Sequence, residues 1–421
     1  MKVAVIGSGG REHAIVNQLL KSKYVTKVCA LPGNAGIGEV AELVDIKASE
    51  IDRIVAYTKV NRFDLVFVAP DDPLAMGLVD RLNETDIRVF GPTRAAAQIE
   101  WSKAFAKGFM ERHGIPTADY KIFNGFDAAY DYLQTAKYPL VVKADGLALG
   151  KGVIICKNKA EAQTALTGIM VEKVFSSAGD SIVIEEFLTG PEITLLVFTD
   201  GKSYSFMPSS QDHKRAYDGN EGPNTGGMGA FSPASAFADE LKREAASKII
   251  EPTLKGLIAE NRTFKGVLYF GLMNTKDGLK VIEYNARFGD PEAQTVLPLL
   301  KTDFIDVIDA CIDGSLDQLK MIWDNKASVC VVAASGGYPV NVVKGYPIEI
   351  GKLDGVTLIH CGTAIKDGQL VTNGGRVFCV TAIADTVKEA AIKIYREIDK
   401  IKFEGMRYRN DIGIRHSIYR G

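Results

Sequence analysis

Residues 281–292 have the sequence VIEYNARFGDPE, and the interpretation of the chain starts from this stretch. Its first residues are β-branched or aromatic, which favours a half-buried β-strand. Side chains alternate faces along a strand. One face is therefore expected to carry Glu283, Asn285 and Arg287, while the apolar even-numbered positions are expected to be buried.

The polar face carries groups that suit a metal and an anion. A carboxylate beside an amide oxygen suits a hard cation such as Mg²⁺, so the predicted metal ligands are Glu283 and Asn285. The guanidinium of Arg287 suits an anionic group. Gly289, Asp290 and Glu292 follow on a turn. A solvent-exposed strand face is the alternative, but so many functional side chains within ten positions argue against it.

Composition indicates a soluble protein of several domains. The chain has 421 residues, which is too long for one core. A net charge of −2 gives no reason to expect nucleic acid or a membrane surface as a partner. The six cysteines show no Cys-x-x-Cys pair, which argues against zinc and disulfides and favours the cytoplasm. The N-terminal apolar run is too short for a signal peptide, and none approaches membrane length.

The N-terminus has the pattern of a doubly wound α/β unit. A buried strand at residues 2–6 is followed by a glycine turn and a helix from Arg11 to about Leu20, an arrangement that binds phosphate. Glu12 occupies the third glycine position of the dinucleotide fingerprint, and the second strand lacks a ribose-binding acid. A lone phosphate therefore fits better than NAD, and a glycine turn without a ligand is the alternative. Asp72 follows another predicted strand, at residues 64–69, at its ligand-binding end.

A second glycine-rich segment lies in the middle of the chain. Lys103 is expected to begin a helix that ends near His113, and a strand at residues 138–143 ends in Lys143. The loop at residues 145–152 is not a Walker A loop, because its spacing differs and a strand follows it. Such a hairpin can fold over phosphates as a mobile lid, with Lys143 and Lys151 as counter-charges, although a plain flexible hairpin is the alternative.

Two further segments are candidates for binding. The strand at residues 181–188 ends in acidic and apolar residues that could meet a purine, although Glu185 and Glu186 would more often face solvent. Residues 209–229 are long, polar and without period, and a structureless stretch of this length tends to be functional or disordered. Clustered donors and glycines favour substrate binding there.

The remaining chain completes the predicted fold. Residues 266–273 and 279–287 are expected to form a hairpin closed by Asp277-Gly278. From residue 326 the pattern indicates a small α+β domain, in which residues 373–376 are interpreted as a hairpin turn rather than a site.

These motifs together resemble a known family. The two lysines, the glycine hairpin and the Glu-x-Asn strand resemble ATP-grasp enzymes. The stretches GSGGREHA, PGNAG, KADGLALGKGV, SQDHKR, GPNTGGMGA and RFGDPEAQ resemble the phosphoribosylamine–glycine ligases along essentially the whole chain. The resemblance implies an N-terminal phosphate-binding α/β domain at 1–100, an ATP-grasp domain at 101–325 with a lid at about 121–190, and a C-terminal α+β domain at 326–421.

The resemblance also implies an activity, partners and site residues. The family joins glycine to 5-phosphoribosylamine in purine biosynthesis, with ATP cleaved to ADP and phosphate and with Mg²⁺ or Mn²⁺; a cytoplasmic monomer is expected. The implied nucleotide-binding residues are Lys103, Lys143, Gly146, Gly150, Lys151, Gly152, Glu185, Glu186, Leu188 and Glu192. The implied substrate-binding residues are Gly9, Gly10, Asn34, Asp72, Asp212, Lys214, Thr225, Gly226, Arg287, Gly289, Asp290 and Glu292.

Two departures from the family pattern are visible. Asp71-Asp72 stands where Glu is common, which leaves the ribose contacts uncertain. Residues 272–274 lack the acid that ATP-grasp relatives often carry before the metal pair, so two protein ligands are expected.

The expected chemistry needs charge neutralisation more than a base. Phosphorylation turns the unreactive glycine carboxylate into glycyl phosphate, which the amine of phosphoribosylamine attacks. The residues expected to assist catalysis are Arg287, Lys143 and Lys151, and no side-chain base is expected to be essential. Asp212 or Asp290 as a base is the alternative.

Three other functions remain as alternatives. An ATP-grasp ligase or carboxylase with a different acid substrate would share the central motifs. A nicotinamide dehydrogenase is disfavoured by the incomplete fingerprint at the N-terminus. A non-catalytic nucleotide-binding protein is disfavoured by the complete set of charged residues.

Overall fold

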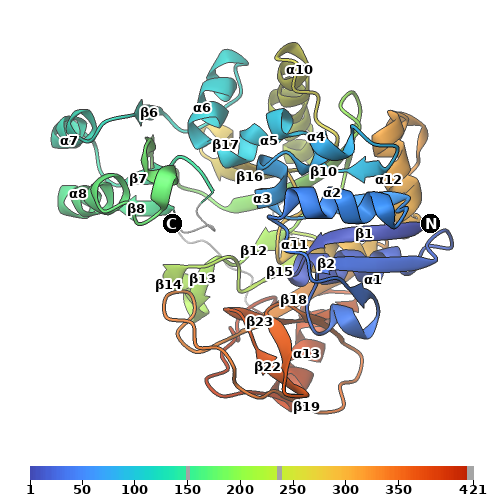
Figure 1. The fold of residues 1–421 in the computed structure, drawn as a ribbon. Helices are drawn as coiled ribbons and strands as arrows, with labels where there is room; N and C mark the ends of the chain where they lie inside the picture. The colour runs from blue at the N-terminus through green and yellow to red at the C-terminus, as the bar shows by residue number, and fades with distance from the viewer. Residues whose placement is uncertain (148–151, 235–238, 415–421) are drawn as a thin grey trace.

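The N-terminal part is a parallel sheet with helices on both faces. The computed structural model describes residues 1–147, 152–234 and 239–414 (Figure 1). The five strands lie in the order β3-β2-β1-β4-β5, with parallel pairing throughout. They are β1 Lys2–Gly7, β2 Lys27–Pro32, β3 Glu42–Leu43, β4 Leu65–Val68 and β5 Arg88–Phe90, and the helices are α1 Gly10–Leu19, α2 Ile51–Val60, α3 Asp71–Ala75, α4 Leu78–Leu82 and α5 Arg94–Trp101. Successive residues of β1 pack into two separate cores, which explains its continuous apolar run.

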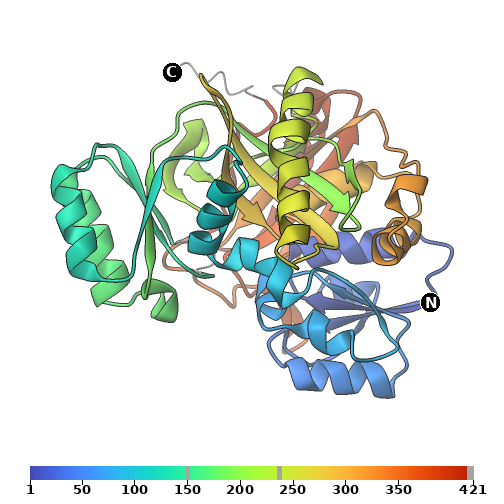
Figure 2. The ribbon, with the colours of Figure 1, turned by 90° about the horizontal axis from the view of Figure 1, so that it is seen from above.

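A second sheet with its own core forms an outlying lobe. Its strands lie in the order β6-β9-β7-β8, and α7 and α8 contribute to a hydrophobic cluster separate from the other cores. In Figure 2 this lobe lies at the left, away from the N-terminal sheet. Its elements are β6 Tyr120–Phe123, α7 Phe126–Thr135, β7 Leu140–Ala144, β8 Val153–Cys156, α8 Lys159–Leu166 and β9 Ile182–Glu186. We call it the lid lobe.

The central sheet is antiparallel, in the order β11-β10-β16-β17. Its strands are β10 Glu192–Thr199, β11 Tyr204–Phe206, β16 Gly266–Thr275 and β17 Gly278–Asn285, and nearby helices are α6 Lys103–Arg112, α9 Asp239–Ala245, α10 Glu251–Ala259, α11 Glu292–Val296 and α12 Phe304–Asp313. The predicted start of α6 at Lys103 is confirmed, since Ser102 Oγ caps it by accepting from Phe105 N at 3.1 Å. The hairpin predicted around Asp277-Gly278 is also confirmed.

A β-bulge interrupts β17 next to its polar residues. Gly271 pairs with Glu283 and Leu272 with Val281, so Ile282 has no partner in the ladder. Simple alternation therefore fails at Ile282, which lines a pocket, whereas Val281 and Tyr284 are both buried. The prediction that every even-numbered position is buried is wrong at this residue.

The C-terminal sheet recruits strands from the middle of the chain. Its order is β12-β15-β18-β23-β20, with α13 against it. Its strands are β12 Gln211–Asp212, β15 Gly229–Ser232, β18 Ala327–Ala334, β20 Thr357–His360 and β23 Arg376–Ala384, and α13 spans Val387–Glu397. Three two-stranded sheets lie nearby among the described residues. They are β13 Arg215–Tyr217 with β14 Glu221–Asn224, β19 Glu349–Ile350 with β24 Ile401–Lys402, and β21 Thr363–Lys366 with β22 Gln369–Thr372.

Two predictions about this region are wrong. Residues 209–229 are not structureless, because they contain β12, β13, β14 and the first residue of β15. These strands have two to four residues each, too short to give a periodic pattern. Residues 373–376 do not close a hairpin, since β22 pairs with β21 while β23 pairs with β18 and β20.

Asn34 joins the N-terminal sheet to the C-terminal sheet. Its Nδ2 donates to the carbonyl oxygens of Ser8 at 2.8 Å, His360 at 2.9 Å and Cys361 at 3.3 Å. Its Oδ1 accepts from the N–H of Ile37 at 3.0 Å. The whole amide of this buried residue is therefore used, and its contacts with His360 and Cys361 join the two sheets. None of the described helices is long and apolar enough to cross a membrane.

Replacing Asn34 is expected to weaken the fold. Asn34→Ala leaves buried carbonyl groups without a donor, which should cost about 1–3 kcal/mol and lower Tm in a calorimetric scan. Asn83→Ala, at an exposed position after α4, is the control. A Tm equal to that of the control would show that Asn34 does not have this structural role.

Candidate active site

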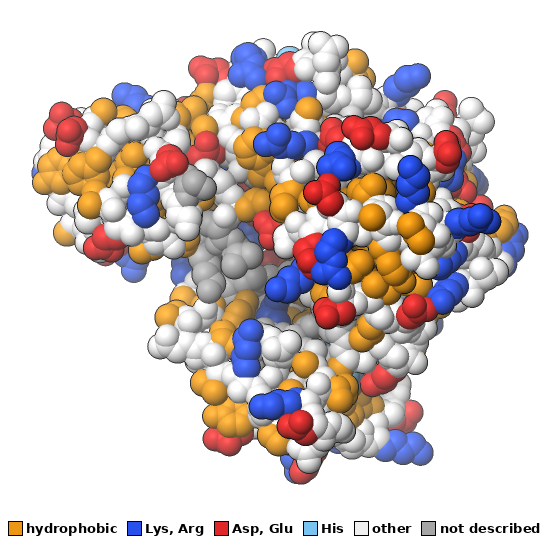
Figure 3. All heavy atoms as spheres, in the orientation of Figure 1, with side chains coloured by type: hydrophobic (Ala, Val, Ile, Leu, Met, Phe, Trp, Pro, Cys, Tyr) orange, Lys and Arg blue, Asp and Glu red, His pale blue; other side chains and the backbone are white. Residues whose placement is uncertain are grey.

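One pocket is lined by all parts of the structure. Its volume is about 1010 Å³, which is enough for a nucleotide and further small substrates. Arg11 and Asp71 come from the N-terminal sheet region, and Tyr338 and Arg376 come from the C-terminal region. Figure 3 shows this face of the molecule hollowed between the lid lobe and the C-terminal lobe below it.

Most of the predicted site residues line this pocket. They are Lys103, Lys143, Gly146, Gly152, Glu185, Glu186, Leu188, Glu192, Asp212, Lys214, Thr225, Gly226, Glu283, Asn285, Arg287, Gly289, Asp290 and Glu292. Gly150 and Lys151 lie outside the residues that the structure describes. Segments far apart in the sequence thus converge on one cavity.

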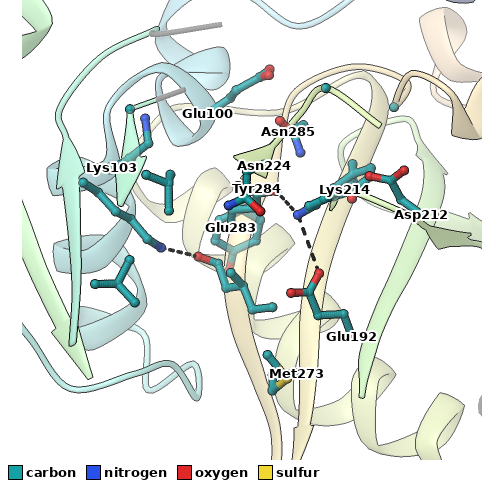
Figure 4. Close-up of a pocket in the computed structure, with 18 of the residues that line it drawn as sticks. Glu100, Lys103, Glu192, Asp212, Lys214, Asn224, Met273, Glu283, Tyr284 and Asn285 are labelled. Atoms are coloured by element: carbon teal, nitrogen blue, oxygen red, sulfur yellow. Dashed lines mark hydrogen bonds and ion pairs between the residues drawn. The ribbon is translucent and has the colours of Figure 1, made fainter. Parts of the chain in front are cut away.

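Lys214 lies between two carboxylates. Its Nζ is 3.1 Å from Glu283 Oε1 and 3.8 Å from Glu192 Oε2 (Figure 4). The charge of Lys214 lowers the pKa of Glu283 to about 2, and the charge of Glu283 raises the pKa of Lys214 well above its usual value. Glu283 is therefore an ionised carboxylate that holds a cation, as a metal ligand requires.

Glu185 lies between two other lysines. Its carboxylate is 2.9 Å from Lys143 Nζ and 3.0 Å from Lys107 Nζ, and all three side chains are buried. Lys143 also donates to the carbonyl of Ile282 at 3.1 Å, which has no ladder partner because of the bulge. Burial lowers the pKa of Lys107 to about 8. Sequence reasoning missed Lys107, although it lies one turn after Lys103 on the same face of α6.

Arg287 contacts the second predicted metal ligand and a further acid. Its Nη2 donates to Asn285 Oδ1 at 3.1 Å and lies 2.8 Å from Glu100 Oε1. Its Nε is buried and has no hydrogen-bond partner among the described residues. The Arg287 side chain lines the pocket, where its charge and this unpaired N–H suit an anionic ligand. Nothing in the sequence around Glu100 indicated a site.

Two acids and a tyrosine, Asp212, Glu292 and Tyr269, lie together in one corner of the pocket. Burial raises the pKa of Asp212 well above its ordinary value, and burial also raises the pKa of Glu292. The charge of Glu292 contributes to the shift at Asp212. Tyr269 lines the same corner and contacts Thr194 Oγ1 at 3.1 Å. Such a corner suits an amino group, which carries or donates protons.

Arg376 brings the C-terminal sheet into the site. Its Nη1 donates to the carbonyl oxygens of Asp290 at 2.6 Å and Gly226 at 2.7 Å, and its Nη2 lies 3.1 Å from Asp290 Oδ2. Residues 373–376 were interpreted as a turn, and the structure corrects this for Arg376. A lone Arg after two glycines gives no local signal, since its partners are 86 and 150 residues away.

Four predicted substrate-binding residues do not line the pocket. The amide of Asn34 is fully used between the two sheets. Gly9 N donates to Glu12 Oε2 at 2.5 Å, so this N–H already has a carboxylate as its partner. Gly10 is buried against Gln294 and Cys361, and Asp72 is exposed while its neighbour Asp71 lines the pocket.

The lid lobe, the central antiparallel sheet and the lysine-rich pocket between them define an ATP-grasp enzyme. The family models described as the N, ATP-grasp (A) and C domains of phosphoribosylglycinamide synthetase match residues 1–100, 101–293 and 328–415. The chain belongs to the phosphoribosylamine–glycine ligase family.

Named relatives agree with this assignment along almost the whole of this chain. The chain is 46 % identical to the phosphoribosylamine–glycine ligase of Caldanaerobacter subterraneus, covering 98 % of this chain and 99 % of the relative. It is 47 % identical to the trifunctional purine biosynthetic protein adenosine-3 of Gallus gallus, covering 98 % of this chain and 42 % of that protein. The crystal structure of the Thermotoga maritima ligase superposes with a TM-score of 0.85 at 32 % identity, covering 98 % and 100 % of the two chains. The activity of the chain is therefore phosphoribosylamine–glycine ligation in purine biosynthesis.

The pairing of Lys214 with Glu283 should make stability depend on pH. Because the pKa of Glu283 is about 2 in the fold, against about 4.3 unfolded, its contribution is complete above pH 4.3 and is lost as pH falls toward 2. Lys214→Met should therefore lower Tm at pH 7, and the difference from the unchanged chain should shrink between pH 5 and pH 3.

The control for this prediction is Lys248→Met, which removes an exposed ion pair with Glu244. It should change Tm little at any of these pH values. If the Tm difference caused by Lys214→Met stays constant down to pH 3, the pair does not hold Glu283 ionised.

Proposed function

We propose that the pocket carries out the ligation through glycyl phosphate, with the polar face of β17 as its centre. The observation that supports this is the convergence of Glu283, Asn285 and Arg287 with Lys143 and Lys214 in one cavity. A carboxylate is a poor electrophile because attack adds charge to an anion. Phosphorylation supplies a leaving group, and the protein then has to position and neutralise charge.

ATP is proposed to lie between the lid lobe and the central sheet. Its phosphates would meet Lys103, whose Nζ donates to Gly146 O at 2.8 Å, together with Lys143 and the loop up to Gly152. Gly150 and Lys151 remain predicted phosphate contacts. Glu185 and the backbone of Glu186 and Leu188 would meet adenine, and Glu192 the ribose. Phosphate oxygens would then compete with Glu185 for Lys143.

The residues present fit a divalent cation at β17. Glu283 and Asn285 supply a carboxylate and an amide oxygen, and both oxygens already hold cationic groups, from Lys214 and Arg287. Mg²⁺ or Mn²⁺ bound there would neutralise phosphate charge during transfer. The chain's part is to keep Glu283 ionised and to aim Asn285, since Arg287 fixes the orientation of its amide.

Glycine and its acyl phosphate are proposed to lie beside Arg287. The guanidinium would hold the carboxylate, while Asp212 and Glu292 would face the amino groups of the two substrates. In the ligation step, the amine nitrogen bonds to the acyl carbon as the carbon–oxygen bond to phosphate breaks. The phosphate leaves with the electron pair, and the amine proton passes to phosphate or solvent, so no side-chain base is required.

The phosphate of phosphoribosylamine is proposed to lie against Arg376 and Arg11. Both line the pocket, and each donates to a backbone carbonyl that fixes its orientation. Arg376 donates to Asp290 O, and Arg11 donates to Phe288 O. The amides of the N-terminal glycine turn are less suitable because Glu12 already accepts from Gly9. We further propose a cytoplasmic location, since all six cysteines are free and buried.

The activity and its substrates can be tested by measuring ADP release with Mg-ATP, glycine and freshly generated phosphoribosylamine, omitting each in turn. Release should require all three. Undiminished release without glycine, or with another small acid in its place, would contradict the substrate assignment.

Arg376→Ala tests the phosphate site. Loss of a charged hydrogen-bond donor should raise KM for phosphoribosylamine about 10- to 100-fold, with KM for ATP changed little. Arg396→Ala, at an exposed position on α13, is the control and should match the unchanged chain. An unchanged KM for phosphoribosylamine would place its phosphate elsewhere.

A further inference from the structure

We propose that Glu100 is the positioning residue for Arg287, and that it acts by holding two consecutive residues at the exit of β17. One carboxylate oxygen, Oε1, lies 2.8 Å from Arg287 Nη2. The other, Oε2, accepts from the backbone N–H of Ala286 at 2.7 Å. A single side chain thus fixes both the main chain and the guanidinium beside the proposed acyl phosphate. This inference rests on the role proposed above for Arg287.

Glu100 reaches this position from a different part of the fold. It lies in the last turn of α5, which packs against α3, α6 and β17. Its side chain is only 6 % exposed, and Figure 4 shows it near Asn285 at one side of the pocket. A carboxylate so nearly buried requires partners, and Ala286 and Arg287 supply them. The contact therefore ties the N-terminal part of the chain to the centre of the site.

The surroundings make Glu100 the closest counter-ion of Arg287. The other charged groups that act on this pair are Asp71 on α3, Arg11 on α1, Lys103 on α6 and Glu292 on α11. Asp71 Oδ2 is 4.0 Å from Arg287 Nη2, which is beyond hydrogen-bond distance. Without Glu100, only neutral acceptors, Phe288 O and Asn285 Oδ1, would hold the guanidinium, and the charge of Asp71 would draw it away from Asn285.

Both carboxylate oxygens are needed for this task. Each accepts from a different N–H group, so an amide at the same place would direct its own N–H₂ at one of the two donors. Glu100→Gln keeps the size of the side chain but breaks one of the two contacts. This variant therefore separates the positioning of Ala286 and Arg287 from the packing that a side chain of this size provides.

The test is a double-mutant cycle with Glu100→Gln, Glu100→Ala, Arg287→Ala and the double variant Glu100→Ala/Arg287→Ala. Both Glu100 variants should lower kcat about 10- to 100-fold while KM for ATP stays within twofold. Because Glu100 acts through Arg287, the double variant should be no slower than Arg287→Ala, within about twofold. Glu111→Gln, at an exposed position on α6, is the matched control and should leave kcat unchanged.

The outcomes separate the proposed role of Arg287 from the proposed positioning role of Glu100. Arg287→Ala with an unchanged kcat would overturn the role of Arg287 and this inference with it. If Arg287→Ala is slow and the effects multiply in the double variant, Glu100 acts independently and only the present inference fails. A normal kcat for Glu100→Gln would also overturn it. Thermal unfolding of each variant separates loss of fold from loss of positioning.

Discussion

The site depends on the pairing of opposite charges in places that are partly or wholly removed from water. A carboxylate or ammonium in such a place is costly unless an opposite charge or several hydrogen bonds compensate for it. Glu283 lies with Lys214, Glu185 with Lys143 and Lys107, and Asp290 with Arg376. Lys214 lies outside the sheet that carries Glu283, Lys107 lies on α6 outside the sheet that carries Glu185, and Arg376 lies on β23 of the C-terminal sheet, so these contacts also hold separate elements around the pocket.

This arrangement explains how anionic substrates can be accommodated. Lys143, Lys214, Arg287 and Arg376 each face a carboxylate, so a phosphate or carboxylate ligand there replaces an existing partner instead of entering an empty positive cavity. A metal ion at Glu283 and Asn285 would likewise replace the cationic groups of Lys214 and Arg287, which contact these two side chains now. Substrate binding is then an exchange of partners, which costs less reorganisation than creating new charges in a dry site.

Local patterns in the sequence predicted the elements that carry most of the site. The β16–β17 hairpin, the start of α6 and most site residues followed from alternation, turn residues and the family resemblance. The bulge at Ile282 could not be predicted, because it depends on register with Gly271 in another strand. Arg376, Glu100 and Asn34 were missed or misassigned for the same reason, since their partners are distant in sequence and appear only when the sheets assemble.

The central claim is that the pocket activates glycine by phosphorylation. It is tested most directly by ligation with glycine that carries ¹⁸O in its carboxylate. One labelled oxygen should appear in the released phosphate in each turnover, because the acyl–oxygen bond breaks when the amine attacks. Unlabelled phosphate would show that no glycyl phosphate forms and that glycine is not activated in this way.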